Sequence, residues 1–160
     1  MNKQIYDIWF SRIEISNKLK LKILDNYKAF EIWNMKEEDL KIIGIKEEYI
    51  YRILDNKYKL NLEKYLLYME KNKIDIINFK SNDYPTNLKR INNMPCYIFT
   101  RGNRNILHED AVAIVGSRNA TEYGKNIARK FAKEIADKNV NIVSGLAIRD
   151  RQICTFRSFR

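Results

Sequence analysis

The segment from Ala111 to Ala147 constrains the fold of this chain more than any other. Residues 111–115 form a continuous apolar run, which is typical of a strand buried in a parallel sheet. A turn follows, and residues 122–138 then repeat apolar side chains at helical spacing, before a second strand expected at 140–143. Strand, helix and strand in succession predict a βαβ unit. The inner face of its helix is expected to carry Ile127, Ala128, Phe131, Ile135 and Ala136.

The first 73 residues show a helical pattern instead. Apolar residues recur at helical spacing from Ile5 onward, and acidic residues followed by Gly44 predict a short helix, a turn and a second helix starting at Lys46. This helix–glycine–helix unit resembles a helix-hairpin-helix, which binds the DNA backbone through main-chain N–H groups. A packing turn in a small helical bundle is the alternative. Residues 1–73 hold 15 basic and 12 acidic side chains, and this small excess does not decide between the two.

The hydrophobic period changes near residue 74. Ile74, Ile76 and Ile77 predict a short strand, and residues 97–99 predict another, with turn-forming residues between them. We therefore expect an α+β protein with a helical module over residues 1–73. An α/β domain with a parallel sheet is expected over residues 74–147.

Two loops of the predicted sheet carry residues suited to an anion. They follow neighbouring parallel strands, and open α/β sheets bind ligands at the carboxyl ends of their strands. Backbone N–H groups at a helix start, hydroxyl groups and a guanidinium together predict a phosphate site. Helix capping by the hydroxyls and a surface ion pair of the arginine are the alternatives. The candidate residues are Gly116, Ser117, Arg118, Thr121, Gly124, Ser144 and Gly145.

Other kinds of site have little support in the sequence. No cysteine–histidine metal spacing and no nucleotide-binding glycine motif is present. His108 lies in a polar loop, and Cys96 is expected to be a small buried residue rather than a nucleophile. We therefore predict no catalytic residue, no metal and no cofactor. The sequence also shows no secretory signal and no membrane-spanning segment, so a cytoplasmic location without a membrane partner is expected.

Several segments, taken together, resemble the DNA-processing protein A family (DprA, also called Smf). They are Tyr84-Pro85-x-x-Leu88-x-x-Ile91-x-x-Met94-Pro95, then Arg101-Gly102, then the run from Val112 through Gly116-Ser117-Arg118 to Gly124, and finally Ile142 to Ala147.

The resemblance implies a sterile-alpha-motif-like or helix-hairpin-helix module ahead of an extended Rossmann domain. It further implies single-stranded DNA binding, protection of incoming DNA in natural transformation, loading of the RecA recombinase, a homodimer, and no catalytic reaction. By the same resemblance, the candidate residues of the first loop hold DNA phosphate, and Ser144 and Gly145 form the neighbouring loop.

The end of the chain departs from the family pattern. Residues 148–160 contain four Arg and no Lys, whereas the preceding 147 residues contain 19 Lys and seven Arg. AT-biased codons for this tail, shifted by one nucleotide, can encode the family continuation Gly-Ile-Asp-Lys-Tyr-Ala-His-Leu-Gly-Ala-Leu. We therefore interpret residues 148–160 as an out-of-frame tail after Ala147. With the resemblance, this implies that residues 74–147 are an incomplete Rossmann-like α/β domain. A truncated sheet should expose an apolar edge, dissolve poorly, bind DNA weakly and lack a secure basis for the homodimer.

Two other functions fit parts of the sequence. A nucleotide-processing Rossmann enzyme of the lysine-decarboxylase-like (LOG) type places its phosphate site in a similar crevice. Residues 1–73 could instead act as a helical protein-interaction module. The net charge of +10 does not discriminate, because the tail contributes four Arg and one Asp, which is +3. The DNA prediction therefore depends on the loop at residues 116–124 and on the resemblance.

Overall fold

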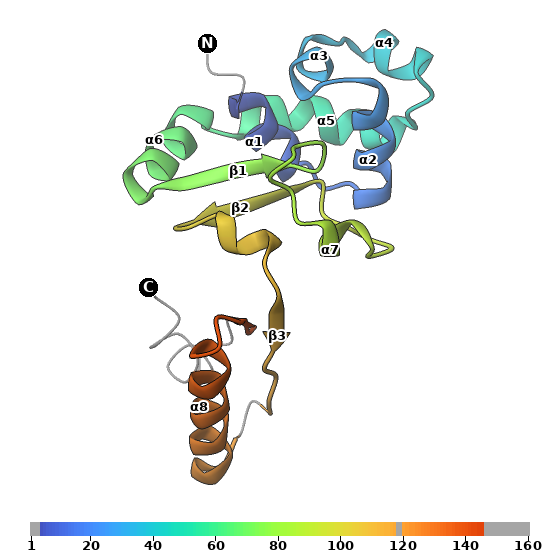
Figure 1. Ribbon diagram of the computed structural model, residues 1–160. Helices are drawn as coiled ribbons and strands as arrows, with labels where there is room; N and C mark the ends of the chain where they lie inside the picture. Colours follow the sequence, from blue (N-terminus) through green and yellow to red (C-terminus); the bar gives the residue numbers. More distant parts are fainter. Residues whose placement is uncertain (1–3, 118–119, 146–160) are drawn as a thin grey trace. The chain divides into compact units, whose positions relative to one another are not determined.

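The computed structural model describes residues 4–117 and 120–145, and the chain divides into two compact units at residues 104 and 105 (Figure 1). The first unit contains α1 (Gln4–Arg12), α2 (Asn17–Asn26), α3 (Ala29–Asn34), α4 (Glu37–Ile42), α5 (Glu47–Lys59), α6 (Leu62–Asn72), β1 (Ile74–Asn78), α7 (Thr86–Lys89) and β2 (Tyr97–Arg101). The second contains the 3-10 helix η1 (Asn105–His108), β3 (Ala111–Ala113), α8 (Glu122–Ala136) and β4 (Asn141–Val143).

Local sequence signals determine where several helices begin and end. The Ser16 hydroxyl accepts a hydrogen bond from the backbone N–H of Leu19 at 3.2 Å and caps α2, and Asn61 caps α6 in the same way. Gly44 has a φ of +80°, a conformation that glycine adopts without the penalty of a Cβ atom. The helix–glycine–helix arrangement expected from the sequence is therefore confirmed.

The core of the first unit forms where the apolar stripes of its helices meet. Trp9 and Phe10 of α1 are fully buried, as are Ile32 of α3 and Ile53 of α5. The ring of Trp9 also meets the ring of Trp33 edge-on, with centroids 5.0 Å apart. Because α1 packs against α3, α5 and α6, it is the central helix of this core.

The β1–β2 hairpin packs with the helices that precede it. The two strands are antiparallel, with a register running from Ile74 opposite Arg101 to Asn78 opposite Tyr97. β1 lies against α1 and α6, and its residues Ile76 and Ile77 are both buried. The boundary between the two compact units therefore lies about thirty residues after residue 74, where the hydrophobic period of the sequence changes. The domain limits 1–73 and 74–147 stay predictions, and the tail 148–160 lies outside the described residues.

The second unit contains the βαβ arrangement that the sequence predicts. β3 and β4 are parallel, with Ala111 opposite Asn141 and Ala113 opposite Val143. α8 connects them and packs against β4. Thr121, which precedes α8, has extended backbone angles suited to an N-cap. The α+β class with a parallel sheet is thus confirmed.

The predicted burial of this sheet is wrong. Ala111, Val112 and Ala113 are all exposed, and Phe131, expected on the inner face of α8, is 55% exposed. Ala132 is buried instead. A parallel strand is buried when helices cover both faces of its sheet, whereas the described sheet has two strands and α8 packs against β4. The expected exposure of apolar side chains is therefore found, while truncation as its cause stays a prediction.

Among residues 4–117 and 120–145, no helix combines the length and the apolar character needed to cross a bilayer.

Candidate nucleic-acid interface

The two candidate loops leave neighbouring strands at the same edge of the second unit's sheet. The backbone N–H of Ile114 donates to the carbonyl oxygen of Val143 at 2.9 Å, which extends the β3–β4 ladder by one residue. Gly116 follows β3 closely, and Ser144 directly follows β4. Gly116, Ser117 and Gly145 are exposed, and Ser144 is half-buried. The structure thus places both loops at the carboxyl ends of adjacent parallel strands.

Open space surrounds the backbone of both loops. A Cβ atom built on Gly116 or on Gly145 would meet no atom within 4 Å. Crowding within the protein therefore does not explain why these two positions are glycine. A ligand that approaches the main chain closely would explain it.

Thr121 is the N-cap of α8. Its hydroxyl oxygen accepts a hydrogen bond from the backbone N–H of Gly124 at 3.1 Å. In this structure Thr121 therefore acts as a helix cap, which was the alternative to phosphate binding. A Cβ atom at Gly124 would lie 3.4 Å from that hydroxyl, a tolerable contact, so Gly124 is also free of a strict steric requirement.

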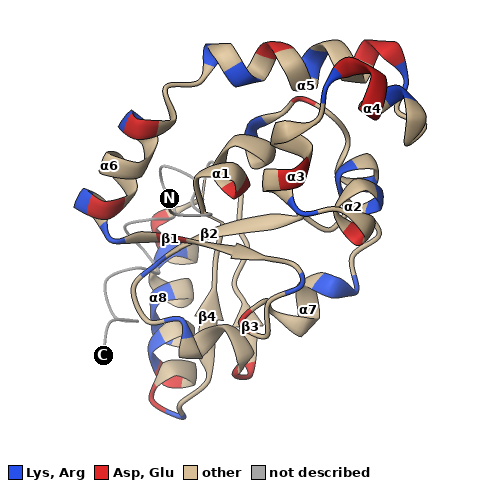
Figure 2. Cartoon of the chain, turned by 90° about the horizontal axis from the view of Figure 1, so that it is seen from above, with Lys and Arg blue, Asp and Glu red and all other residues tan. Residues whose placement is uncertain are grey.

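Charged side chains flank the start of α8, which carries cations and anions along its length (Figure 2). The Lys125 ammonium is paired with the Glu122 carboxylate. That hydrogen bond lowers the pKa of Glu122, so the carboxylate stays charged at neutral pH. A phosphate at this helix start would compete with Glu122 for Lys125. Lys125 was not among the residues predicted from the sequence, although a lysine three residues after an acidic helix start is a recognisable signal of such a pair.

Arg118, the remaining predicted residue of the first loop, lies outside the described residues. The structure therefore places the loops at residues 116–117 and 144–145 at adjacent strand ends, and the start of α8 at 121–124 follows the first loop along the chain. The role of these residues in binding stays a prediction.

The turn at Gly44 forms its hydrogen bonds with the helix before it. The N–H of Gly44 donates to Lys41 and the N–H of Ile45 donates to Leu40, the hydrogen bonds of a Schellman helix end. These two N–H groups are thus paired within the protein. Acidic side chains also gather on α4 (Figure 2), and their charge opposes contact with a DNA phosphate.

Two residues of other possible chemistry, Cys96 and His108, lie outside the candidate loops. Cys96 is buried, and burial raises the pKa of its thiol to about 11, so the reactive thiolate is disfavoured at neutral pH. His108 is exposed at the end of η1. Across residues 4–117 and 120–145, no group of three or more His, Cys, Asp or Glu side chains could hold a metal ion.

Part of the chain matches a known protein family. The model of the DNA recombination-mediator protein A family matches residues 75–149. Protein Smf of Borreliella burgdorferi is 29% identical over 135 residues, which are 84% of this chain and 42% of that protein. DNA processing protein DprA of Bacillus subtilis is 41% identical over 75 residues, which are 46% of this chain and 25% of that protein.

A solved structure shares the fold. DNA processing protein A (DprA) from Streptococcus pneumoniae matches with a TM-score of 0.63 at 24% identity, over 89% of this chain and 49% of that one. The chain thus spans half or less of the length of each of these relatives. Residues 75–149, across the β1–β2 hairpin and the βαβ unit, match the DNA-processing protein A (DprA/Smf) family.

Proposed function

We propose that the loops at residues 116–124 and 144–145 bind the phosphates of single-stranded DNA. The observation that carries the proposal is the pair of loops at the ends of adjacent parallel strands, with open space above Gly116 and Gly145. The family match supports DNA as the ligand. In the same proposal, the protein protects incoming DNA and loads a RecA-type recombinase, as a homodimer and without a catalytic step.

The chemistry of the proposed contact follows from the groups in the loops. Main-chain N–H groups near Gly116 and at the start of α8 would point toward the phosphate, and the α8 dipole favours negative charge there. Arg118 would add a bidentate contact. Lys125 would transfer from Glu122 to the phosphate, so removing the Glu122 charge should strengthen binding.

The main experiment measures fluorescence anisotropy of a labelled oligothymidine with the full chain over a range of salt concentrations. Affinity should fall steeply with salt, because phosphate contacts release counterions. Gly116→Val should weaken binding by at least about tenfold, since a branched side chain would occupy the space above the main chain. Circular dichroism should show unchanged folding, since nothing lies within 4 Å of that position.

Charge variants separate a phosphate site from general attraction. Arg118→Ala should lower affinity and reduce the slope of log affinity against log salt by about one. Arg101→Ala is the matched control, because it removes the same charge from an exposed position at the end of β2. Binding that responds equally to both arginine variants, and is unchanged by Gly116→Val, would refute the proposed site.

The two alternative functions can be measured separately on the same purified protein. A LOG-type enzyme would release a free base from a nucleoside monophosphate. An interaction module would retain a protein partner in the absence of DNA and after both loop substitutions. Either result without DNA binding would replace the proposal.

A further inference from the structure

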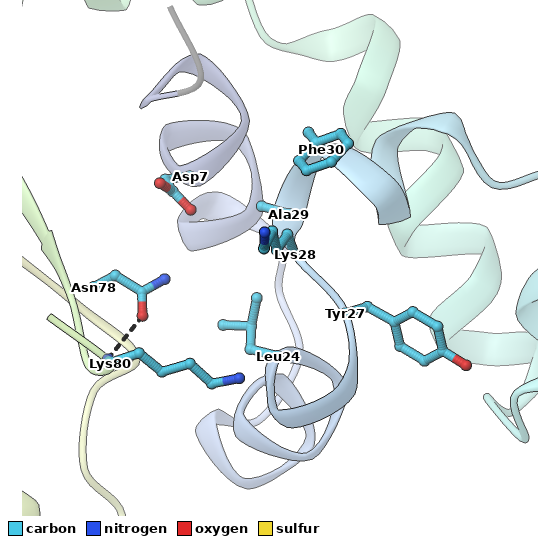
Figure 3. A pocket seen from close by; sticks show the side chains of 8 residues that line it. All are labelled: Asp7, Leu24, Tyr27, Lys28, Ala29, Phe30, Asn78 and Lys80. Carbon is cyan, nitrogen blue, oxygen red and sulfur yellow. Dashed lines mark hydrogen bonds between the residues drawn. The ribbon is translucent and has the colours of Figure 1, made fainter.

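A pocket in the first unit lies outside the proposed phosphate loops. It opens between α1, the segment joining α2 to α3, and the end of β1, with a volume of about 300 Å³ (Figure 3). Sites for small molecules begin near this size, at roughly 300 Å³, and combine apolar walls with a few converging polar groups. This pocket has both features.

The polar floor is built around the carboxylate of Asp7. One of its oxygens accepts a hydrogen bond from the Tyr97 hydroxyl at 2.7 Å, and Figure 3 shows the Asn78 amide facing it. The carbonyl oxygen of that amide accepts from the backbone N–H of Lys80 at 2.9 Å, which orients it. A carboxylate offers about four acceptor positions, so these neighbours leave Asp7 with capacity for N–H donors of a ligand.

The Asp7 carboxylate is also partly removed from water. Desolvation raises the pKa of Asp7, although the hydrogen bonds from Tyr97 and Asn78 act in the opposite direction. A ligand that donates further hydrogen bonds would replace some of the lost hydration of the carboxylate.

The walls and the rim differ from the floor. Leu24 is buried at one end of the pocket and the half-buried Phe30 lies at the other, with Lys28 and Ala29 between them (Figure 3). Lys28 and Lys80 stand at the exposed rim, and the Lys80 ammonium donates to the Asp25 carbonyl oxygen at 3.0 Å. The pocket therefore offers an aromatic surface, a hydrogen-bond acceptor inside and positive charge outside.

We propose that this pocket binds one nucleotide, with its base between Leu24 and Phe30, its amino group on Asp7 and its phosphate near Lys28 and Lys80. The three features of the pocket match the three parts of a nucleotide, namely the planar ring, the N–H donors and the anion. Where the nucleotide belongs to a DNA strand, this inference builds on the proposed function. A free nucleotide is the other source, and the experiment separates the two.

The acceptor on the floor also predicts a base preference. Guanine presents a ring N–H beside its exocyclic amino group, cytosine and adenine present an amino group, and thymine lacks one. Because Asp7 can only accept when ionised, the order of affinity should begin with guanine and end with thymine.

The test uses ¹H–¹⁵N spectra of the full 160-residue chain titrated separately with dGMP, dTMP and 2-deoxyribose 5-phosphate. The amide signals around Asp7, Phe30 and Lys80 should shift with dGMP. The Kd for dGMP should be at least about tenfold lower than for dTMP, since one additional hydrogen bond to a charged group changes the binding free energy by about that factor in Kd. Equal shifts with all three compounds, or no shifts at the pocket, would overturn the proposal.

Substitutions identify the group that reads the base. Asp7→Asn keeps the shape and an oxygen for the Tyr97 hydroxyl, but removes the anionic acceptor, and should abolish the preference for dGMP over dTMP. Lys22→Gln is the charge control, since Lys22 is exposed on α2 and does not line the pocket. If Asp7→Asn fails to fold, Phe30→Leu provides a second reading, because loss of stacking should weaken both nucleotides severalfold. An unchanged preference in Asp7→Asn, or unchanged affinities in Phe30→Leu, would refute the site.

The source of the nucleotide is distinguished with oligonucleotides. If the chain binds single-stranded DNA while dGMP leaves the pocket signals unmoved, this inference fails and the proposed function stands. If dGMP moves the pocket signals and no oligonucleotide binds, the proposed function fails and the pocket is a site for a free nucleotide. If a guanine-containing oligonucleotide moves the same signals, and Asp7→Asn weakens it more than an oligothymidine, the pocket takes a base from the strand.

Discussion

The two compact units use similar amphipathic patterns and reach different degrees of burial. In the first unit, apolar residues from several helices and from β1 meet in one core, with Trp9 and Phe10 fully buried. In the second unit, Ala132 is the one buried apolar side chain among residues 105–117 and 120–145. Val115 there is 87% exposed and Phe131 is 55% exposed.

The difference shows that an amphipathic pattern indicates which side chains can be buried. It does not indicate which other element will cover them. α1 meets α3, α5 and α6, whereas the α8 contacts within the described sheet are mainly with β4. Hydrophobic stabilisation scales with the apolar area removed from water, so the second unit gains less of it per residue.

The largest expected effect compares two phenylalanines. Phe10→Ala should lower the free energy of unfolding by about 3–5 kcal/mol, the cost of a cavity in a packed core. Phe131→Ala should change it by less than about 1 kcal/mol, because its ring is already largely in water. Urea denaturation followed by tryptophan fluorescence measures the first, and circular dichroism measures the second. Similar losses in both variants would remove the contrast between the units.

Glycine substitutions give the next contrast. Gly44→Ala should destabilise the first unit by about 1–2 kcal/mol, since the turn requires a left-handed backbone. Gly116→Ala should alter stability by less than about 0.5 kcal/mol, because its Cβ would enter open space. Thermal melts of both variants provide the comparison. A marked destabilisation by Gly116→Ala would mean that this glycine serves the fold, which would weaken the case for a ligand site.

Helix caps should show a smaller effect in each unit. Ser16→Ala and Thr121→Ala each remove the side-chain acceptor of one N-cap and should cost about 1 kcal/mol. We expect hydrogen exchange to accelerate throughout the first unit for Ser16→Ala, and only within α8 for Thr121→Ala. Thr121→Ser is the control, since it keeps the cap. Loss of protection across both units from Thr121→Ala would indicate that they unfold together.

The smallest effect is a difference in pH dependence. Burial raises the pKa of Asp7 above 3.8, so its contribution favours the folded state at low pH and is lost as pH rises through the raised value. The Lys125 hydrogen bond lowers the pKa of Glu122 below 4.5, so its contribution is present above that pH and is lost on acidification. Denaturation between pH 3 and 7 should show opposite changes of slope in Asp7→Asn and Glu122→Gln. Slopes that change in the same direction would contradict the assignment.

Several elements could be predicted because their signals are local. The stop at Gly44, the β3–α8–β4 order and the strands near residues 74 and 97 each depend on residues close together in the sequence. The proximity of the loops at Gly116 and Ser144 followed from one rule of parallel sheets. The pairing of Lys125 with Glu122 was missed because it was not part of the motif that drew attention to the loop.

The sequence by itself indicated the order of the main elements and the family resemblance, and it supplied the candidate phosphate loops as a prediction, because periodicity, turn residues and motifs act over short distances. Only the tertiary structure decided that the β1–β2 hairpin packs on α1 and α6, that β3 is exposed, and that Asp7, Phe30 and Asn78 line one pocket. The physical reason is that cover and convergence depend on contacts between residues far apart in the chain. No local pattern specifies which surfaces will meet.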